Sequence, residues 1–484
     1  MVGSSRSPAG HVRPAVGLLL AGALIAVASP GAAISQEVEA ETSFARVDAL
    51  VFGEGENSAS PAVIDPAGSF AYFGSGEGGA PRVVKVDLDS FAVADVLTLR
   101  DERADLGAAV IHPDGTHAYF AAHQLLFAVD LTSFAVQGVV AIPEMIYPRT
   151  AVIDPAGEFA YFGTNDWDAR VVKVDLATLT HVGSIEFEPG ESRLFASVID
   201  PEGRYAYFGT NAEPGYIVRI DLENFTRAGA LATLDVAWLT AAALAPDGAT
   251  AYFTSSASGL LEVDLTAFTV GRYTGLSSPE LPVFGTPETV VVDPGGSYAY
   301  VGTFADPAQI VQVDLAGFAP VDAIMLETDE SWLWSAVMEP AGTFAYFGSG
   351  MFPGRVVKVA TGFTPAATYQ FVGFERPVEN PPVVNRANAG QTIPLKWRLL
   401  DHDGVPVTDL ESVQVTTTRM PDDPDATVEP IEEYAAGESG LQNLGDGYYQ
   451  FNWKTPRTYA GSSYTLTLDL GDAGSHHALF EFPR

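Results

Sequence analysis

The sequence predicts an all-β protein: a seven-bladed β-propeller followed by a small Ig-like β-sandwich. The propeller is predicted by a repeat that occurs seven times. Each copy follows one pattern, with substitutions in several copies: a short apolar run, a turn of the type Asp-Pro-x-Gly, a run of the type aromatic-Ala-Tyr-Phe-Gly and a run of the type Val-x-Val-Asp-Leu. The copies are marked by turn prolines spaced 42 to 48 residues apart: Pro66, Pro113, Pro155, Pro201, Pro246, Pro294 and Pro340. This period, with four short strands per unit, is typical of propeller blades.

The copy around Pro155 shows how one repeat provides four strands. Residues 151–154 form a short apolar run suited to a buried strand, and the turn after it uses Pro to fix φ and Gly to accept a positive φ. Residues 159–162 and 171–174 give the second and third strands, and residues 180–187 give a fourth strand at the edge. No 3.6-residue apolar periodicity runs through the repeat, which excludes a helical solenoid.

The start of the chain has the features of an export signal. Arg6 and Arg13 precede an apolar run at residues 15–28, and small-residue cleavage patterns end at Ala28 and Ser35. We therefore assign residues 1–35 to a signal peptide and expect a secreted or cell-surface protein without stable membrane insertion. A retained, uncleaved anchor is the alternative.

Composition limits the classes of partner and chemistry. The chain has 61 acidic and 25 basic residues, a formal net charge of -36, which disfavours binding to nucleic acid and anionic lipid. It has no cysteine, so disulfides, thiolate metal ligands and thiol nucleophiles are excluded. We read the acidic surface as a solubility feature and expect a monomer.

Two segments compete to complete the last blade, because the last repeat supplies only three clear strands. Residues 43–51 resemble residues 90–98, the fourth strand of the first full repeat. A fourth strand from the N-terminus would close the ring and remove exposed sheet edges. The competing segment, residues 363–371, contains Pro365, and proline is confined to sheet edges. We favour closure by the N-terminal strand.

After residue 359 the repeat stops and the pattern changes. A Pro-rich linker at residues 377–382 is followed by strand-like runs separated by Gly, Asp and Pro turns, at residues 392–399, 413–418, 448–454, 464–470 and 478–482. This pattern favours a small β-sandwich. We assign residues 43–371 to the propeller and residues 372–484 to the sandwich.

Both parts resemble known families. The repeats, over roughly residues 43–360, are similar to those of YVTN-type seven-bladed propellers of bacterial and archaeal surface-layer and secreted proteins. Ala-Tyr-Phe-Gly-Thr at residues 160–164 stands where the name-giving tetrad of that family would be. The resemblance implies the fold and leaves the function open, because such propellers carry many unrelated activities.

The C-terminal part resembles the PxKF domain of secreted bacterial proteins. The motifs that carry the resemblance are Asn380-Pro381-Pro382, Pro394-Leu395-Lys396-Trp397, residues 448–455, and Tyr459-Ala460-Gly461. Trp397 replaces the phenylalanine of the family, and the cysteine pair of many members is absent. The resemblance therefore implies the fold without its disulfide.

Candidate ligand-binding residues lie just before each inner strand, at the predicted mouth of the central channel. Four residues before each turn proline the sequence is uniformly small, whereas six and eight residues before it the residues vary. The variable positions supply cations, a carboxylate and aromatic rings: Tyr147, Arg149, Arg193, Trp238, Glu288, Trp332 and Trp334. Arginine pairs with carboxylates and tryptophan stacks on apolar ring faces, so an acidic or sugar-like ligand would fit. The alternative is that the loops tolerate variety and the aromatic rings plug the channel.

The sequence offers little for catalysis or metal binding. His112, His117 and His123 fall in one blade but alternate between strand ends instead of converging. Residues 165–168 and 401–404 place oxygen ligands at alternate positions, but ordinary turns explain them better than calcium loops. We expect no catalytic residues, no metal and no cofactor.

The sequence favours a non-catalytic binding module at or near the cell surface, with a protein or a carbohydrate as ligand. Two alternatives stay open. One is a lactonase-like or lyase-like propeller enzyme that uses Glu288, Arg149 and Arg193. The other is a structural component of the cell envelope.

Overall fold

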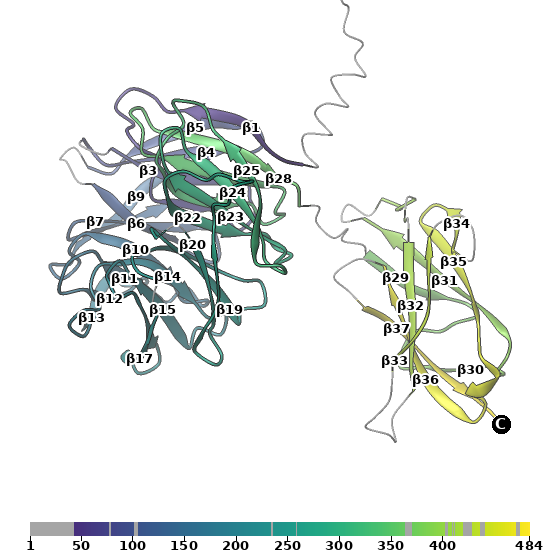
Figure 1. Ribbon diagram of the computed structural model, residues 1–484. Helices are drawn as coiled ribbons and strands as arrows, with labels where there is room; N and C mark the ends of the chain where they lie inside the picture. Colours follow the sequence, from purple (N-terminus) through teal and green to yellow (C-terminus); the bar gives the residue numbers. More distant parts are fainter. Residues whose placement is uncertain are drawn as a thin grey trace, which may run out of the picture. The chain divides into compact units, whose positions relative to one another are not determined.

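The computed structural model describes residues 43–76, 79–100, 105–233, 236–257, 259–363, 370–401, 405–408, 410, 412–419, 428–435, 441–470 and 475–484. The predicted signal peptide, residues 1–35, lies outside them. The chain divides between Phe363 and Thr364 into two compact units (Figure 1). In the described residues both are built from β-strands, with one short 3-10 helix, η1 (Arg457–Tyr459). No helix in the described part of the chain is long and apolar enough to cross a membrane.

The first unit is a seven-bladed β-propeller in which every blade is a four-stranded antiparallel sheet, as predicted. Blade 1 comprises β2 (Ala62–Ile64), β3 (Phe70–Ser75), β4 (Arg82–Asp87) and β5 (Ala92–Thr98). Blade 2 comprises β6 (Leu106–Ile111), β7 (His117–Ala122), β8 (Leu125–Asp130) and β9 (Ala135–Ala141). Blade 3 comprises β10 (Pro148–Ile153), β11 (Phe159–Thr164), β12 (Arg170–Asp175) and β13 (Thr180–Glu186).

The remaining blades follow the same order. Blade 4 comprises β14 (Leu194–Ile199), β15 (Tyr205–Thr210), β16 (Tyr216–Asp221) and β17 (Thr226–Ala232). Blade 5 comprises β18 (Leu239–Leu244), β19 (Thr250–Ser255), β20 (Gly259–Asp264) and β21 (Thr269–Gly275). Blade 6 comprises β22 (Thr286–Val292), β23 (Tyr298–Phe304), β24 (Gln309–Asp314) and β25 (Ala319–Met325). Blade 7 comprises β26 (Leu333–Met338), β27 (Phe344–Ser349), β28 (Arg355–Thr361) and β1 (Phe44–Val51).

The N-terminal strand completes blade 7, which confirms the predicted closure. β1 pairs antiparallel with β28, from Phe44 opposite Thr361 to Val51 opposite Arg355. The first strand of each blade contacts the first strand of the next, and β2 contacts both β6 and β26, so the ring is closed. The competing segment does not serve this role. Its last residues, Gln370 and Phe371, begin β29 (Gln370–Glu375) of the second unit, so the predicted boundary at 371 lies slightly too late.

The turn between the first and second strands of each blade explains the recurring Asp-Pro-x-Gly. Its glycine has φ between +67° and +77° in all seven copies, a region that side chains disfavour: Gly68, Gly115, Gly157, Gly203, Gly248, Gly296 and Gly342. The aspartate closes the turn. In blade 1, the Asp65 carboxylate accepts hydrogen bonds from the backbone N–H groups of Ser69 and Phe70, at 2.8 and 3.0 Å. The motif is therefore fixed by backbone geometry.

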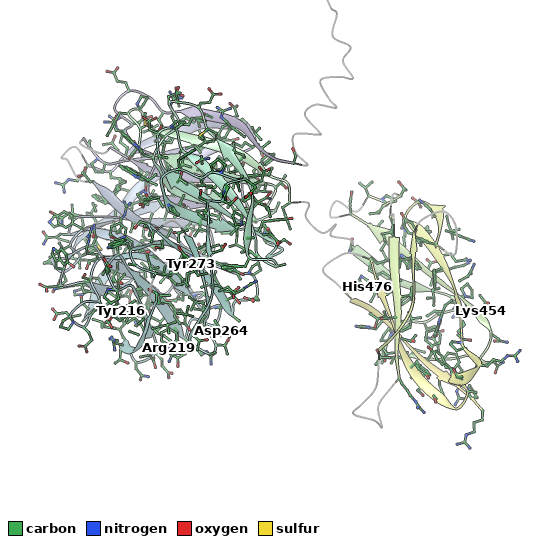
Figure 2. The ribbon with its side chains drawn as sticks, in the orientation of Figure 1. Tyr216, Arg219, Asp264, Tyr273, Lys454 and His476 are labelled. Carbon is green, nitrogen blue, oxygen red and sulfur yellow. The ribbon has the colours of Figure 1, made fainter. Side chains whose placement is uncertain are left out.

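The recurring Tyr of the second strand joins neighbouring blades. It packs against an aromatic side chain in the turn that precedes the fourth strand of the next blade, with ring centroids 5.9 to 6.1 Å apart in Tyr72–Phe134, Tyr161–Phe225, Tyr207–Phe268, Tyr252–Phe318 and Tyr346–Phe91. Basic side chains cover several of these pairs. Arg219, labelled in Figure 2, lies over the rings of Tyr205 and Phe268. At the last interface Tyr300 packs on Phe44, which comes from the closing strand.

The second unit is a sandwich of two sheets. One sheet contains β29 (Gln370–Glu375), β31 (Thr392–Leu400), β35 (Tyr448–Lys454) and β34 (Leu441–Gly445) in that order. The other contains β30 (Val384–Arg386), β37 (Ser475–Phe482), β36 (Ser462–Asp469), β32 (Ser412–Arg419) and β33 (Val428–Ala435) in that order. Side chains of both sheets, including Trp397, Trp453 and Phe480, form one buried core.

A buried ion pair ties the closing strand to the loop between blades 6 and 7. In β1, the Arg46 Nε lies 2.8 Å from Glu330 Oε2, and the Glu330 carboxylate is only 1% exposed. Hydrogen bonding to Glu330 raises the pKa of Arg46. The chain therefore closes the ring with both a strand ladder and a charge-assisted pair.

We expect Arg46→Ala to reduce the free energy of unfolding of the propeller by about 3 kcal/mol, because it leaves the Glu330 carboxylate buried and unpaired. Urea unfolding followed by tryptophan fluorescence measures this. The matched control is Arg204→Ala, which breaks an exposed pair with Glu202 and should cost less than about 1 kcal/mol. If both variants lost the same free energy of unfolding, the buried Glu330 carboxylate would not need its ion pair with Arg46.

Candidate ligand site at the channel mouth

Seven residues, one per blade, meet at one end of the central channel. They are the residues six positions before the turn prolines: Ser60, Gly107, Arg149, Phe195, Thr240, Glu288 and Trp334. Together with the small residues that follow them, they line a cavity of about 180 Å³. We call this cavity the channel mouth. The structure thus brings Arg149, Glu288 and Trp334 together, three of the predicted site residues.

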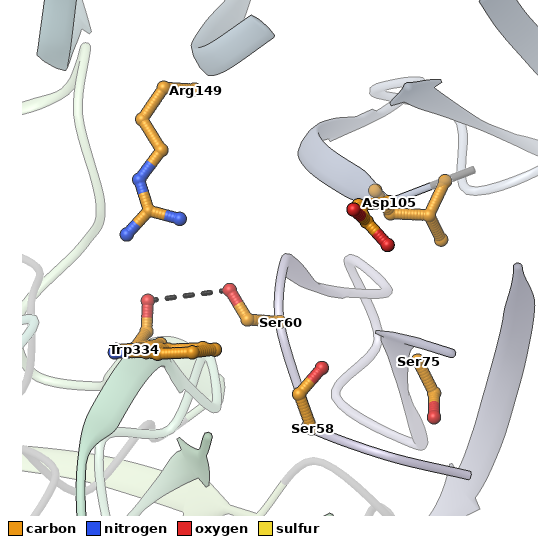
Figure 3. Close-up of a pocket in the computed structure, with 7 residues that line it drawn as sticks. Ser58, Ser60, Ser75, Asp105, Arg149 and Trp334 are labelled. Atoms are coloured by element: carbon orange, nitrogen blue, oxygen red, sulfur yellow. Dashed lines mark hydrogen bonds between the residues drawn. The ribbon is translucent and has the colours of Figure 1, made fainter. Parts of the chain in front are cut away.

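A second cavity of about 180 Å³ adjoins the channel mouth, and its lining includes Ser58, Ser60, Asp105, Arg149 and Trp334. Figure 3 shows the Arg149 guanidinium, the Asp105 carboxylate and the Ser58 and Ser60 hydroxyls around a common space. Asp105 and Ser58 occupy positions that vary between repeats, yet they were not among the predicted site residues. Apart from this variability, nothing in the sequence marks Ser58 or Asp105 as a ligand-binding residue.

Glu288 is the carboxylate of the channel mouth. Burial raises its pKa, and the positive charge of Arg149 and a hydrogen bond from Thr286 oppose that rise without cancelling it. Arg149 in turn lies 5.3 Å from the ring centroid of Phe195. The mouth therefore offers a cation, an aromatic face and a carboxyl group whose proton is held more tightly than in water.

The other four predicted residues stand eight positions before the turn prolines, outside the mouth. Tyr147, Arg193, Trp238 and Trp332 all have left-handed backbones, with φ between +48° and +59°. Trp332 stacks on Phe304 with centroids 5.9 Å apart, and Trp238 is exposed. Tyr147 and Arg193 line a separate open cavity. None of these four residues lines the channel mouth, so the structure does not gather all seven predicted residues in one cavity.

Left-handed conformations are costly for bulky residues, roughly 1 kcal/mol each, and glycine would relieve the strain. The chain nevertheless places Tyr, Arg and Trp there. The same conformation recurs at residues that pack between blades, so it is a regular feature of the blade turns: Phe91, Phe134, Phe225, Phe268 and Phe318.

Exposed aromatic side chains of the described residues gather on one face of the propeller. This face consists of the loops that lead into the inner strands and the loops between second and third strands, and we call it the upper face. All seven exposed aromatic residues lie in or beside these loops: Tyr147, Trp167, Trp238, Tyr273, Phe284, Phe304 and Phe352. The opposite, lower face is formed by the turns rich in Asp and Gly. The asymmetry marks the upper face as the one suited to binding.

The three histidines of blade 2 and the acidic turn at residues 165–168 do not converge on one point. Residues 402–404 of the other candidate turn lie outside the described residues. His112 pairs with Asp114 at the lower face, at 2.7 Å, whereas His123 stacks on Tyr147 at the upper face. Asp166 accepts a hydrogen bond from the Thr164 hydroxyl, as a turn residue does. Throughout the described ranges, no group of three or more His, Cys, Asp or Glu side chains could hold a metal ion.

No protein-family model and no curated protein matches the sequence. Among solved structures, the chain is similar to the hydrazine synthase of Kuenenia stuttgartiensis, with a TM-score of 0.55 and 15% identity over 64% of this chain and 97% of that one. It is also similar to the β-propeller domain of Cps50 (Swd1) from Myceliophteria thermophila, with a TM-score of 0.54 and 13% identity over 66% of this chain and 99% of that one. These likenesses confirm the propeller fold alone. The resemblances to YVTN repeats and to the PxKF domain stay predictions.

We expect Glu288→Gln to stabilise the protein at pH 7 but not at pH 4. The raised pKa of Glu288 means that its carboxyl group favours folding when protonated, and that this contribution is lost as the pH rises through the folded-state pKa. Glutamine keeps the neutral form at every pH. Urea unfolding midpoints at the two pH values test this, with the exposed Glu202→Gln on the lower face as control. If Glu288→Gln changed the urea midpoint by the same amount at both pH values, the raised pKa of Glu288 would be contradicted.

Proposed function

We propose that this chain is an exported, non-catalytic binding module that presents the upper face of its propeller to a ligand. The observation that carries this proposal is the confinement of exposed aromatic side chains to that face. Aromatic residues and arginine provide most of the binding energy at recognition surfaces, because they bury large areas at a low cost in conformational entropy. Export is supported by the signal-like residues 1–35, and the acidic composition argues against nucleic acid as the ligand.

The channel mouth would supply specificity. Arg149, Glu288 and Trp334 line a small cavity at the centre of the aromatic upper face. A polar group of the ligand could enter it and pair with Arg149, while the surrounding loops make the larger contact. A protein loop and a sugar both carry such groups.

We also propose that the repeats are of the YVTN type and that the second unit is a PxKF-like, Ig-like sandwich. In support, Trp397, which replaces the phenylalanine of the family motif, is fully buried in the sandwich core and stacks on Tyr449. A domain of this kind, attached to a propeller, would act as a spacer or a second contact surface.

Catalysis is the second candidate, because the raised pKa of Glu288 beside Arg149 is what a general base in a lactonase-like or lyase-like reaction needs. The two candidates differ in one measurable way. A binding module leaves its ligand unchanged, and Glu288→Gln alters its affinity only. An enzyme converts the ligand, and Glu288→Gln abolishes turnover.

The test is to probe the purified chain against arrays of glycans and of cell-surface proteins and to repeat each positive signal with variants. We expect Arg149→Gln to weaken binding about tenfold or more, because a hydrogen bond to a charged group is lost. Arg204→Gln is the matched control, since this arginine lies exposed on the lower face. Signals that fall equally in both variants, or only with Arg204→Gln, would refute the upper-face proposal.

A further inference from the structure

A third cavity opens on the upper face, separate from the channel mouth and from the cavity that adjoins it. It has a volume of about 530 Å³ and is lined by Tyr147, Asn165, Asp166, Trp167 and Arg193. We call it the outer groove. Its rings are accessible, since Trp167 is 80% and Tyr147 is 61% exposed. The mouth and the groove contain different residues, so a ligand in one does not require a ligand in the other.

The outer groove is held in place by backbone hydrogen bonds between its loops. Asn165 N donates to Tyr147 O at 2.9 Å, and Arg193 N donates to Asp166 O at 3.0 Å. His123 stacks on Tyr147 with centroids 4.6 Å apart and supports that ring from one side. The polar and aromatic groups of the groove are therefore pre-arranged, which lowers the entropic cost of binding.

Arg193 is the cation of the outer groove. Its guanidinium lies 5.8 Å from the ring centroid of Trp167 and 5.9 Å from that of Phe195, and its Nε donates to Asn165 Oδ1 at 3.4 Å. Among the residues that the structure describes, the hydrogen-bond acceptor of the Arg193 side chain is therefore an amide oxygen and not a carboxylate. The net charge of -36 repels an anionic ligand at long range, but at short range the Arg193 guanidinium can pair with a carboxylate of the ligand through two hydrogen bonds.

We propose that the outer groove binds an acidic polysaccharide through a carboxylate-bearing sugar ring. A pyranose ring has an apolar C–H face, which suits stacking on Trp167 or Tyr147, and hydroxyl groups at its edge. Asn165 and Asp166 lie where they can exchange hydrogen bonds with these hydroxyls, and Arg193 receives the carboxylate. A peptide ligand would need a path for its backbone donors and acceptors, whereas rings beside an amide, a carboxylate and an arginine match the alternating apolar and polar surface of a sugar.

The experiment uses the full chain and calorimetric titration with short oligomers of galacturonate, glucuronate and mannuronate, each beside its neutral counterpart of equal length. At least one acidic oligomer should bind about tenfold more tightly than its neutral counterpart, since Arg193 adds a charged hydrogen bond. Trp167→Ala should weaken the binding of that oligomer about tenfold, and Arg193→Gln should remove the preference for the acidic form.

Two further variants separate recognition from folding. Arg193→Gly relieves the left-handed backbone at φ +59°, so it should keep or raise the unfolding midpoint while still losing the acidic preference. Val182→Ala changes an exposed residue of β13, the outer strand of blade 3, outside the groove, and should leave affinity unchanged.

Failure of the native chain to bind any of the acidic oligomers would overturn the proposal, as would equal losses of affinity with Trp167→Ala and Val182→Ala. If an array ligand is found that depends on Arg149 while no acidic oligomer binds, the groove proposal fails and the general binding function stands.

Discussion

The pairing of β1 with β28 is the interaction on which the rest of the propeller depends. Seven sheets arranged around an axis are stable as a ring only when the last blade is complete, because an unfinished blade would expose the edge of β28. The N-terminal strand supplies the missing ladder, the Phe44 ring for the blade 6–7 interface and Arg46 for the buried Glu330. The chain has no cysteine, so these non-covalent contacts carry the closure without a disulfide.

Closure also explains how the two faces of the propeller differ. Every blade runs through its strands in the same sense, so the short turns rich in Asp and Gly all lie at the lower face and the longer loops at the upper face. The turns have little freedom, since their backbones require Gly at positive φ and a carboxylate acceptor. The loops have no such requirement. The residue types of the seven repeats therefore differ most at the upper face. There, aromatic and basic side chains lie around the channel mouth and the outer groove.

The fold could be predicted in detail from the sequence because the residues that recur in each repeat are those that the backbone of a blade requires. The turn glycines, the four strands of each blade and the closing strand all follow from residues that recur at a fixed spacing. The site was predicted only in part. Arg149, Glu288 and Trp334 share a register position, which places them in one ring. Two positions earlier, Tyr147 and Arg193 line a separate cavity, and the sequence does not signal which residues of neighbouring loops meet there.

Trp167 was missed for another reason: residues 165–168 read as an ordinary acidic turn, and their nearness to Arg193 depends on blade packing. The predicted end of the propeller at residue 371 lies inside the second unit. Phe371 contacts Phe374 and His476 of the sandwich, and such contacts cannot be read from the sequence.

Closure by the N-terminal strand can be tested most directly with a pair of engineered cysteines, since the chain has none of its own. Ala45 in β1 lies opposite Ala360 in β28, and facing residues of antiparallel strands are close enough for a disulfide. In the double variant Ala45→Cys/Ala360→Cys, mild oxidation should convert both thiols into one intramolecular disulfide and raise the unfolding midpoint of the propeller. Two thiols that stay free, or that link separate chains instead, would contradict a ring closed by β1.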